Sequence, residues 1–140
     1  MTDQASIQDS ASAVAEVVSR LEAQFGARLS KTAAIRERFG KDESFHASVP
    51  PDAVVTPEST EEVSQIVKLC AEHQVPVIPY GTGTALEGHV AALHGGISIN
   101  MQEMNDVIEV HDEDLDVVVQ PGVTRKQLNR YLHDRGLFFP

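Results

Sequence analysis

A pair of adjacent prolines, Pro50 and Pro51, divides the 140-residue chain into two differently patterned parts. Proline cannot continue a helix and also restricts the residue before it, so the pair marks a boundary. Before the pair, apolar residues recur at helical spacing, and after it short apolar runs alternate with turns. We therefore expect an α+β fold, with residues 1–48 as a helical N-terminal extension and residues 49–140 as the main domain.

Two helices are predicted ahead of the prolines. The first covers residues 10–25 and ends before Gly26, and the polar residues that precede it are expected to be loose. The second covers residues 31–39, with Ser30 as its cap and Gly40 as its end. The helical spacing of the first is carried by Val14, Val17, Val18, Leu21 and Phe25.

A strand followed by a capped helix opens the main domain. After a short strand at 54–55, Ser59 and Glu62 have the spacing of a capping box, in which each side chain accepts a hydrogen bond from the backbone near the helix start. The apolar stripe of this helix is formed by Val63, Ile66, Val67, Cys70 and Ala71.

The rest of the domain is predicted to be mostly strand. Strands are expected at 75–79, 96–100, 107–111 and 115–120, the last two joined as a hairpin. A second capping box, Thr124 and Gln127, opens a helix that ends at Gly136 and turns Leu128, Tyr131 and Leu132 inward. The final residues, LFFP at 137–140, resemble the start of a buried strand. Because a complete domain rarely ends in this way, a truncated chain is favoured over a C-terminal edge strand.

The charge balance excludes several classes of partner. A net charge of −10 argues against nucleic acid and anionic membranes, which are bound through basic patches. The single cysteine, Cys70, rules out an internal disulfide framework and, lying on an apolar helix stripe, is expected to be packed and inert. Neither a signal peptide nor an apolar run of membrane-spanning length is present. We expect a cytoplasmic protein, with the inner face of a membrane as the alternative.

A glycine-rich loop follows the predicted strand at 75–79. It reads IPYGTGTALEGHV, and its glycines allow a backbone to approach phosphate closely. A Rossmann fingerprint is excluded because leucine, Leu86, stands at the third glycine position. A P-loop is excluded because histidine and valine follow Gly88, where lysine and a hydroxyl residue belong.

The charges around this loop define the kind of phosphate site it could form. No lysine or arginine occurs between Lys68 and Arg125. A diphosphate would therefore be held by backbone N–H groups, by the hydroxyls of Thr82 and Thr84, and by His89. Such a site suits a resident cofactor better than a nucleotide hydrolase, which needs Mg²⁺ and cationic groups. A plain glycine-rich connection between strands remains the alternative at this stage.

Metal sites are disfavoured. Asp112, Asp114 and Asp116 have the spacing of the first ligands of an EF-hand, but Val117 replaces the required glycine and Val123 the closing glutamate. These acidic residues are therefore expected in a solvated hairpin turn. His89 and His94 lie five residues apart without a well-placed third ligand, so no metal site is expected there either.

The order of these elements resembles one family. The runs PPDAVVTPESTEEVSQIVKLCAEHQVPVIPYGTGTALEGHV, GGISINMQEMNDVIEV and LDVVVQPGVTRKQLNRYLHDRGLFFP resemble the N-terminal part of FAD-linked oxidases of the vanillyl-alcohol oxidase / p-cresol methylhydroxylase (PCMH) group. They are most similar to its D-lactate dehydrogenase (cytochrome) and glycolate oxidase FAD-subunit branch. The resemblance implies the first subdomain of a PCMH-type FAD-binding domain, with a mixed sheet and flanking helices.

The resemblance also implies which residues hold FAD. The loop that matches Tyr80, Gly81, Thr82, Gly83 and Thr84 wraps the pyrophosphate with backbone amides in this family. Further cofactor-binding positions carried over by match are Leu86, Gly88, His89, Pro121, Gly122, Val123 and Pro140. Many relatives have glycine where Ala85 and His89 stand, so Ala85 requires a negative φ, or some strain if the backbone there is left-handed. The branch implies noncovalent FAD rather than attachment through His89.

The function implied by the family is oxidation of a 2-hydroxy acid such as D-lactate. A base takes the hydroxyl proton, hydride passes from the substrate carbon to the flavin, and electrons then leave to a cytochrome, a quinone or an electron-transfer flavoprotein. No residue of this chain is predicted as the catalytic base, because the family's substrate domain should follow residue 140. The alternatives are a stand-alone FAD- or nucleotide-binding module, a subunit that completes a flavin site with a partner chain, and an inactive truncation product.

Overall fold

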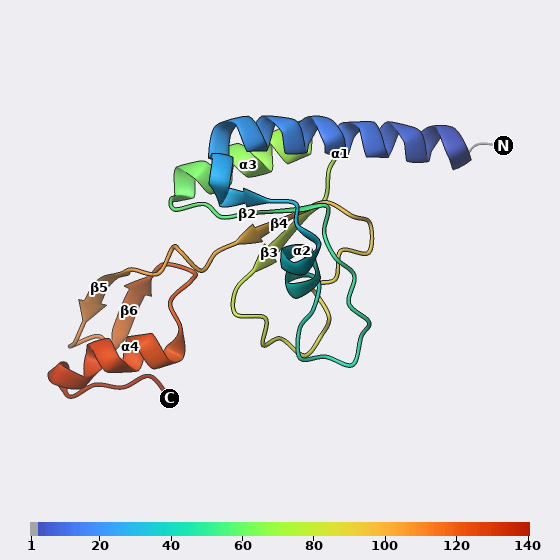
Figure 1. The fold of residues 1–140 in the computed structure, drawn as a ribbon. Coiled ribbons are helices and arrows are strands. Elements are labelled where there is room, and N and C mark those ends of the chain that lie inside the picture. Colours follow the sequence, from blue (N-terminus) through green and yellow to red (C-terminus); the bar gives the residue numbers. More distant parts are fainter. Residues whose placement is uncertain (1–2) are drawn as a thin grey trace.

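The computed structural model describes the backbone of residues 3–140 and the side chains from residue 10 onward. A four-stranded sheet with the order β1-β2-β4-β3 forms its main part, and a two-stranded hairpin with one helix extends from it (Figure 1). The strands of the main sheet are β1 Leu29–Ser30, β2 Ala53–Val55, β3 Val77–Tyr80 and β4 Ile97–Asn100. β1 pairs antiparallel with β2, and the other two pairings are parallel.

The parallel register of β2 and β3 on either side of β4 follows from the helix that connects them. This helix, α3 (Thr60–Glu72), begins at Ser59, whose hydroxyl accepts a hydrogen bond from Glu62 N at 3.2 Å. The Glu62 carboxylate accepts from Glu58 N at 2.7 Å, one residue ahead of the predicted partner. The predicted helix start is thus confirmed, and the helix forms the crossover that parallel strands require.

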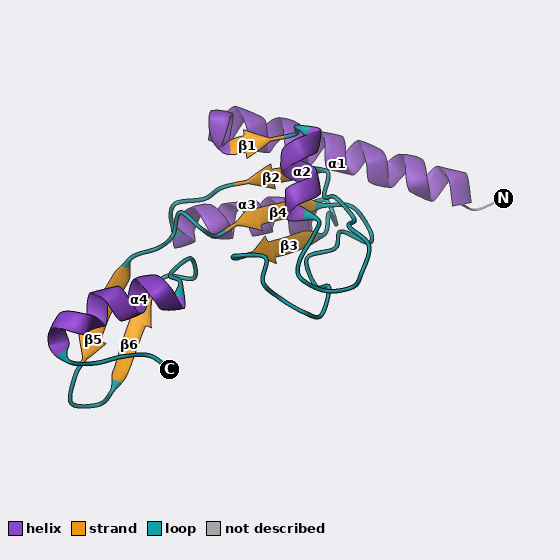
Figure 2. Ribbon diagram, turned by 60° about the horizontal axis from the view of Figure 1, so that its bottom comes forward, coloured by secondary structure: helices purple, strands orange, loops and turns teal. Residues whose placement is uncertain are grey.

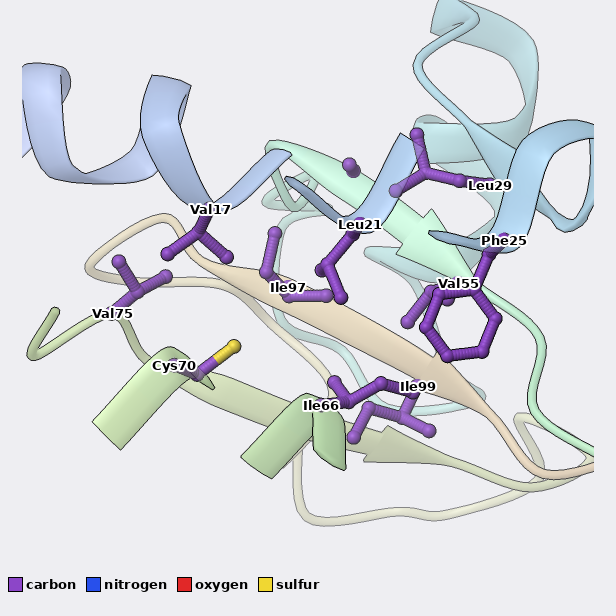
Figure 3. Close-up of a cluster of buried hydrophobic side chains, with 11 residues drawn as sticks. Val17, Leu21, Phe25, Leu29, Val55, Ile66, Cys70, Val75, Ile97 and Ile99 are labelled. Carbon is purple, nitrogen blue, oxygen red and sulfur yellow. The ribbon is translucent and has the colours of Figure 1, made fainter. Parts of the chain in front are cut away.

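One face of the sheet is covered by α1 (Asp3–Phe25) and α3, and the other by α2 (Ala33–Phe39) (Figures 1 and 2). In the first core, α1 contributes Val17, Leu21 and Phe25, which pack with Ile97 and Ile99 of β4 (Figure 3). The second core collects the side chains that point to the opposite face: Phe39, Val54, Ile78, Tyr80, Val90 and Ala92. The alternation along β2 and β4 follows the two-residue period of a strand.

The N-terminal elements differ from the sequence prediction in two ways. Helix α1 already begins at Asp3, so described residues that were expected to be loose are helical. Ser30 lies in β1, opposite Val54, and Thr32 takes the N-cap position of α2. The reason is tertiary: Leu29 is buried in the first core, and its backbone completes an edge of the sheet.

The apolar stripe of α3 is also rotated from the predicted one. Ile66 and Cys70 are fully buried and Leu69 packs against the same core, whereas Val67 is 42% exposed and Ala71 is exposed. The face of this helix that packs against the core is therefore turned toward Leu69, away from Val67 and Ala71.

The C-terminal part consists of β5 (Val107–His111), β6 (Asp116–Val119) and α4 (Arg125–Leu132). The predicted hairpin is confirmed as an antiparallel pair with a bulge between Val107 and Glu109. Thr124 Oγ1 accepts from Gln127 N at 3.2 Å, as the second capping box predicts. Leu128 and Leu132 of α4 are buried, but Tyr131 is 49% exposed, so its predicted inward orientation was wrong.

The last four residues do not begin a buried strand. Phe138 is 76% exposed and Phe139 50% exposed. The backbone of Phe139 is bonded to the side chain of Asn129, which accepts from its N at 2.6 Å and donates to its O at 2.8 Å. The carboxamide of α4 thus satisfies the backbone groups that a neighbouring strand would otherwise pair.

Candidate cofactor-binding site

The glycine loop begins where β3 ends at the edge of the main sheet. Gly83 and Gly88 have φ angles of +74° and +71°, a conformation that L side chains rarely adopt. A Cβ on Gly83 would also clash with the Tyr80 hydroxyl, and one on Gly88 would lie 2.5 Å from His46 Cδ2. Two of the loop's glycines are therefore required by its shape, whereas a Cβ on Gly81 would meet nothing within 4 Å.

Five of the predicted site residues share one cavity of about 290 Å³. It is lined by Gly81, Thr82, Gly83, Thr84, Ala85, His89 and Val90. None of the N–H groups of residues 82–87 donates to a backbone carbonyl of the described chain. The hydroxyls of Thr82 and Thr84 lie 3.0 Å apart and are exposed. The loop thus presents backbone donors and two hydroxyls at one open surface.

Tyr80 does not line this cavity. Its side chain is buried, stacks at 4.4 Å on Phe39, and places its hydroxyl within reach of Arg38 O at 3.3 Å and Lys41 O at 3.4 Å. Burial raises the pKa of this hydroxyl, as do Asp42 and Glu43, and Arg38 opposes them. Tyr80 therefore anchors the start of the loop on the N-terminal segment.

The other predicted site residues lie farther along the chain. Leu86 is 69% exposed and, like Gly88, lies outside the cavity lining. Pro140 is exposed at the C-terminal end of the chain and is not among the residues that line the cavity. Of the predicted site residues, the structure therefore brings only those of the glycine loop together around the cavity.

Pro121, Gly122 and Val123 approach the loop through an intermediate turn. Gly122 N donates to Met104 O at 2.8 Å, and a Cβ on Gly122 would clash with Met101 O. From the same turn, Gln102 donates its side-chain amide to Gly81 O at 2.7 Å. The turn at 101–104 thus connects the segment after β6 to the first glycine of the loop.

The segment at 42–46 covers the far half of the loop, which the sequence reasoning missed. Glu43 N donates to Ala85 O at 3.1 Å, and the His46 ring packs on Gly88. Asp42 is buried, and its Oδ1 accepts from Ser44 N at 3.0 Å. No local pattern signals this contact, because about forty residues separate the two segments and only the packing of β2, β3 and β4 unites them.

Two other predictions concern reactive groups. Cys70 is fully buried, and desolvation raises the pKa of its thiol to about 11, so it is inert as predicted. Among the residues whose side chains the structure describes, no three of the metal-ligating types gather as a metal centre would require. Within residues 3–140, no helix has the length and hydropathy needed to cross a bilayer.

The loop fits the pyrophosphate of a resident dinucleotide cofactor. Free N–H groups, glycines at positive φ and two hydroxyls are the donors that such a group needs. Ala85 is accommodated, because the described non-glycine residues with positive φ are Gln74 and Leu115. No lysine or arginine lies between Lys68 and Arg125, so the donors are uncharged.

Residues 51–140 match the family described as FAD binding domain. The chain belongs to this family. Its FAD cofactor, predicted from the loop and the order of elements, is thereby confirmed.

Two named relatives are similar in sequence to this chain. The chain is 51% identical over 129 residues to the probable mitochondrial D-lactate dehydrogenase of Danio rerio, covering 91% of this chain and 26% of that protein. It is 52% identical over 98 residues to the mitochondrial D-lactate dehydrogenase [cytochrome] of Arabidopsis thaliana, covering 69% and 17%. The chain thus spans about a quarter or less of the length of these relatives.

The fold is confirmed by a solved structure. The substrate-bound structure of p-cresol methylhydroxylase has a TM-score of 0.73 at 23% identity, over 90% of this chain and 25% of that one. The mixed sheet with flanking helices is therefore that of a PCMH-type FAD-binding domain.

Proposed function

We propose that this chain is the FAD-binding part of a flavin-dependent 2-hydroxy-acid dehydrogenase whose substrate is D-lactate or a similar acid. The observation that carries the proposal is the loop at 81–89, with N–H groups left unpaired by the backbone in a chain of the FAD binding domain family. The names of the two relatives, both D-lactate dehydrogenases, support the choice of substrate class.

In this proposal, the loop residues hold FAD noncovalently by its pyrophosphate. The backbone N–H groups of Gly81, Thr82, Gly83 and Thr84 act as donors, and the two threonine hydroxyls add to them. His89 contributes a ring N–H from the cavity wall. When bound, FAD supplies the two-electron acceptor for the oxidation.

The other predicted cofactor-binding residues belong to the same proposal, but they lie outside the cavity that the loop residues line. Tyr80 acts by anchoring the loop, and Leu86 and Gly88 shape its outer half. We place Pro121, Gly122 and Val123 on the nucleotide side of FAD, and Pro140 on an approach toward the flavin. We place the start of the FAD-binding domain near residue 49, with residues 1–48 as an extension that completes its core.

The partners proposed for the whole enzyme are the hydroxy acid and an electron acceptor. A cytochrome is favoured over a quinone or an electron-transfer flavoprotein, because the Arabidopsis thaliana relative carries that acceptor in its name. The cytoplasmic location stays a proposal, because both relatives are named as mitochondrial.

Flavin spectroscopy tests the proposal. The purified protein is titrated with FAD while flavin fluorescence is recorded, and the complex is then precipitated with acid. Saturable quenching, with flavin released into the supernatant, supports noncovalent FAD. A chain that leaves FAD fluorescence unchanged contradicts the binding role, and flavin retained in the pellet contradicts noncovalent attachment. Bleaching of the flavin by D-lactate in the full-length protein tests the activity, and failure to bleach contradicts it.

A further inference from the structure

We propose that Asp42 is a positioning residue of the FAD site, whose buried carboxylate holds the far half of the glycine loop, residues 85–89, in its binding shape. The inference rests on the proposed function and adds a residue that lies outside the matched region 51–140. Asp42 acts through Gly88 and His89 and is not assigned a contact with FAD itself.

Asp42 is unusual among the acidic residues of this chain because it is buried. Asp42 is only 8% exposed, and its Oδ2 is buried without a hydrogen-bond partner in the described chain. Oδ1 accepts from Ser44 N at 3.0 Å. A buried carboxylate oxygen is costly unless donors face it, so the groups that surround it determine its role.

Two of those groups, Gly88 and His89, come from the glycine loop. The hydroxyl of Ser44 is the main cause that lowers the pKa of Asp42, and the N–H of Ser44, the N–H of Gly88 and the charge of His89 add to it, against desolvation by burial. Asp42 is therefore an anion beside the loop, between Lys41, whose O accepts from the Tyr80 hydroxyl at 3.4 Å, and Glu43, whose N donates to Ala85 O at 3.1 Å. His89 lines the cavity.

Neighbouring contacts show that the whole segment is docked on the loop. Glu43 N donates to Ala85 O at 3.1 Å, and the His46 ring fills the space beside Gly88. Beyond the loop, Ala92 N donates to Val49 O at 2.9 Å. Together with the contact of Lys41 O to the Tyr80 hydroxyl, these contacts hold the chain on both sides of Asp42 against the loop.

This arrangement predicts pre-organisation of the FAD site. A loop held in its bound shape before FAD arrives loses less conformational freedom on binding. An Asn at position 42 keeps the volume and an acceptor for Ser44 N, but removes the charge and the second acceptor, the buried Oδ2. The far half of the loop would then open more often, with no change in the apolar core.

Hydrogen exchange tests this inference without any need for FAD. We expect D42N to raise amide exchange severalfold in residues 85–92 of the apo protein, while exchange in β4 stays at the wild-type level. The control, Glu43→Gln, removes one charge from the adjacent exposed side chain and should leave the loop unchanged. Unchanged loop exchange in D42N, or an equal rise in the control, overturns the inference.

A second measurement decides the case if D42N fails to fold. In the wild-type protein, the carboxyl ¹³C signal of Asp42 and the amide signal of Gly88 are followed by NMR as the pH is lowered. We expect both signals to titrate together, below the ordinary range of aspartate. If the amide signal of Gly88 does not shift as Asp42 titrates, the inference is overturned.

The FAD titration separates this inference from the proposed function. Weaker FAD binding by D42N, with normal binding by Glu43→Gln, supports both. Normal wild-type binding with an unaffected D42N leaves the proposed function intact and contradicts the role of Asp42. No binding by the wild type contradicts the proposed function, and the hydrogen-exchange data still test whether Asp42 holds the loop.

Discussion

Arg28 and Glu62 form a two-pronged ion pair between the turn after α1 and the first turn of α3. Arg28 Nη1 lies 2.8 Å from Glu62 Oε2, and Nη2 lies 2.7 Å from Oε1. The hydrogen bond from Arg28, more than any other cause, holds the pKa of Glu62 below its usual value. The pair joins the turn after α1 to the helix that crosses between parallel strands.

We therefore expect acid to weaken this connection. A carboxylate whose pKa is lower in the folded state stabilises the fold above the unfolded value, 4.5, and this stability is lost as the pH falls through the folded value. Arg28→Lys, which cannot make the two-pronged contact, should lower the urea midpoint at neutral pH and flatten the acid dependence. Glu58→Gln is the control, since Glu58 lies 3.4 Å from Arg28 and is largely exposed. Equal urea midpoints for Arg28→Lys and wild type would contradict the expectation.

Gly83 offers a sharp test of the loop. Gly83→Ala forces an L residue into a left-handed conformation, which costs about 1–2 kcal/mol, and adds a clash with the Tyr80 hydroxyl. We expect FAD to bind about tenfold more weakly, since about 1.4 kcal/mol corresponds to that ratio. Gly81→Ala, where a Cβ meets nothing, should bind FAD as the wild type does. Equal losses in both variants would show that loop strain does not control FAD binding.

Leu21 tests whether α1 is part of the core. Leu21 is fully buried among residues of β2, α3 and β4, so Leu21→Ala should lower the free energy of unfolding by about 2–5 kcal/mol. Leu93 is 74% exposed, and Leu93→Ala should change the free energy of unfolding by no more than about 0.5 kcal/mol. Chemical denaturation measures both. A small effect of Leu21→Ala would mean that the extension contributes little to stability.

His111 should make the hairpin sensitive to pH. Its ring lies 2.5 Å from Asp116 and 3.1 Å from Glu109, and the hydrogen bond to Asp116 is the main cause that raises its pKa above 6.5. A raised folded value means that its contribution is fully present below pH 6.5 and is lost as the pH rises through the folded value. NMR titration of the ring should show a smaller pKa increase in Asp116→Asn. An unchanged titration in that variant would contradict the pairing.

Local signals in the sequence predicted the elements that depend on neighbours along the chain. Ser59 and Thr124 both cap helices by accepting from the residue three positions on, because this contact needs only a few residues in the right order. The hairpin of β5 and β6 was equally predictable from its acidic turn. Glycine spacing and the lack of nearby lysine and arginine in the sequence predicted a phosphate-binding loop, and the resemblance to the family named FAD as its cofactor.

Contacts between distant segments were not predictable in this way. Strand β1 has only two residues, and Ser30 was taken as a helix cap because its pairing with Val54 of β2 cannot be seen locally. The rotation of α3 and the exposure of Tyr131 likewise depend on which face a neighbour covers. Hydrophobic pattern alone predicts that a side chain can be buried, while packing decides whether it is.

The sequence by itself determined the family, the cofactor and the loop, because each rests on residue types at fixed spacing. Only the tertiary structure decided what supports that loop. The parallel pairing of β2, β3 and β4 brings the segment at 42–46 onto the loop, where Glu43 N donates to Ala85 O, although 42 residue positions separate these two residues in the chain. Burial then gives one carboxylate an environment that the other acidic side chains described by the structure do not share, since Asp42 is the only buried one among them.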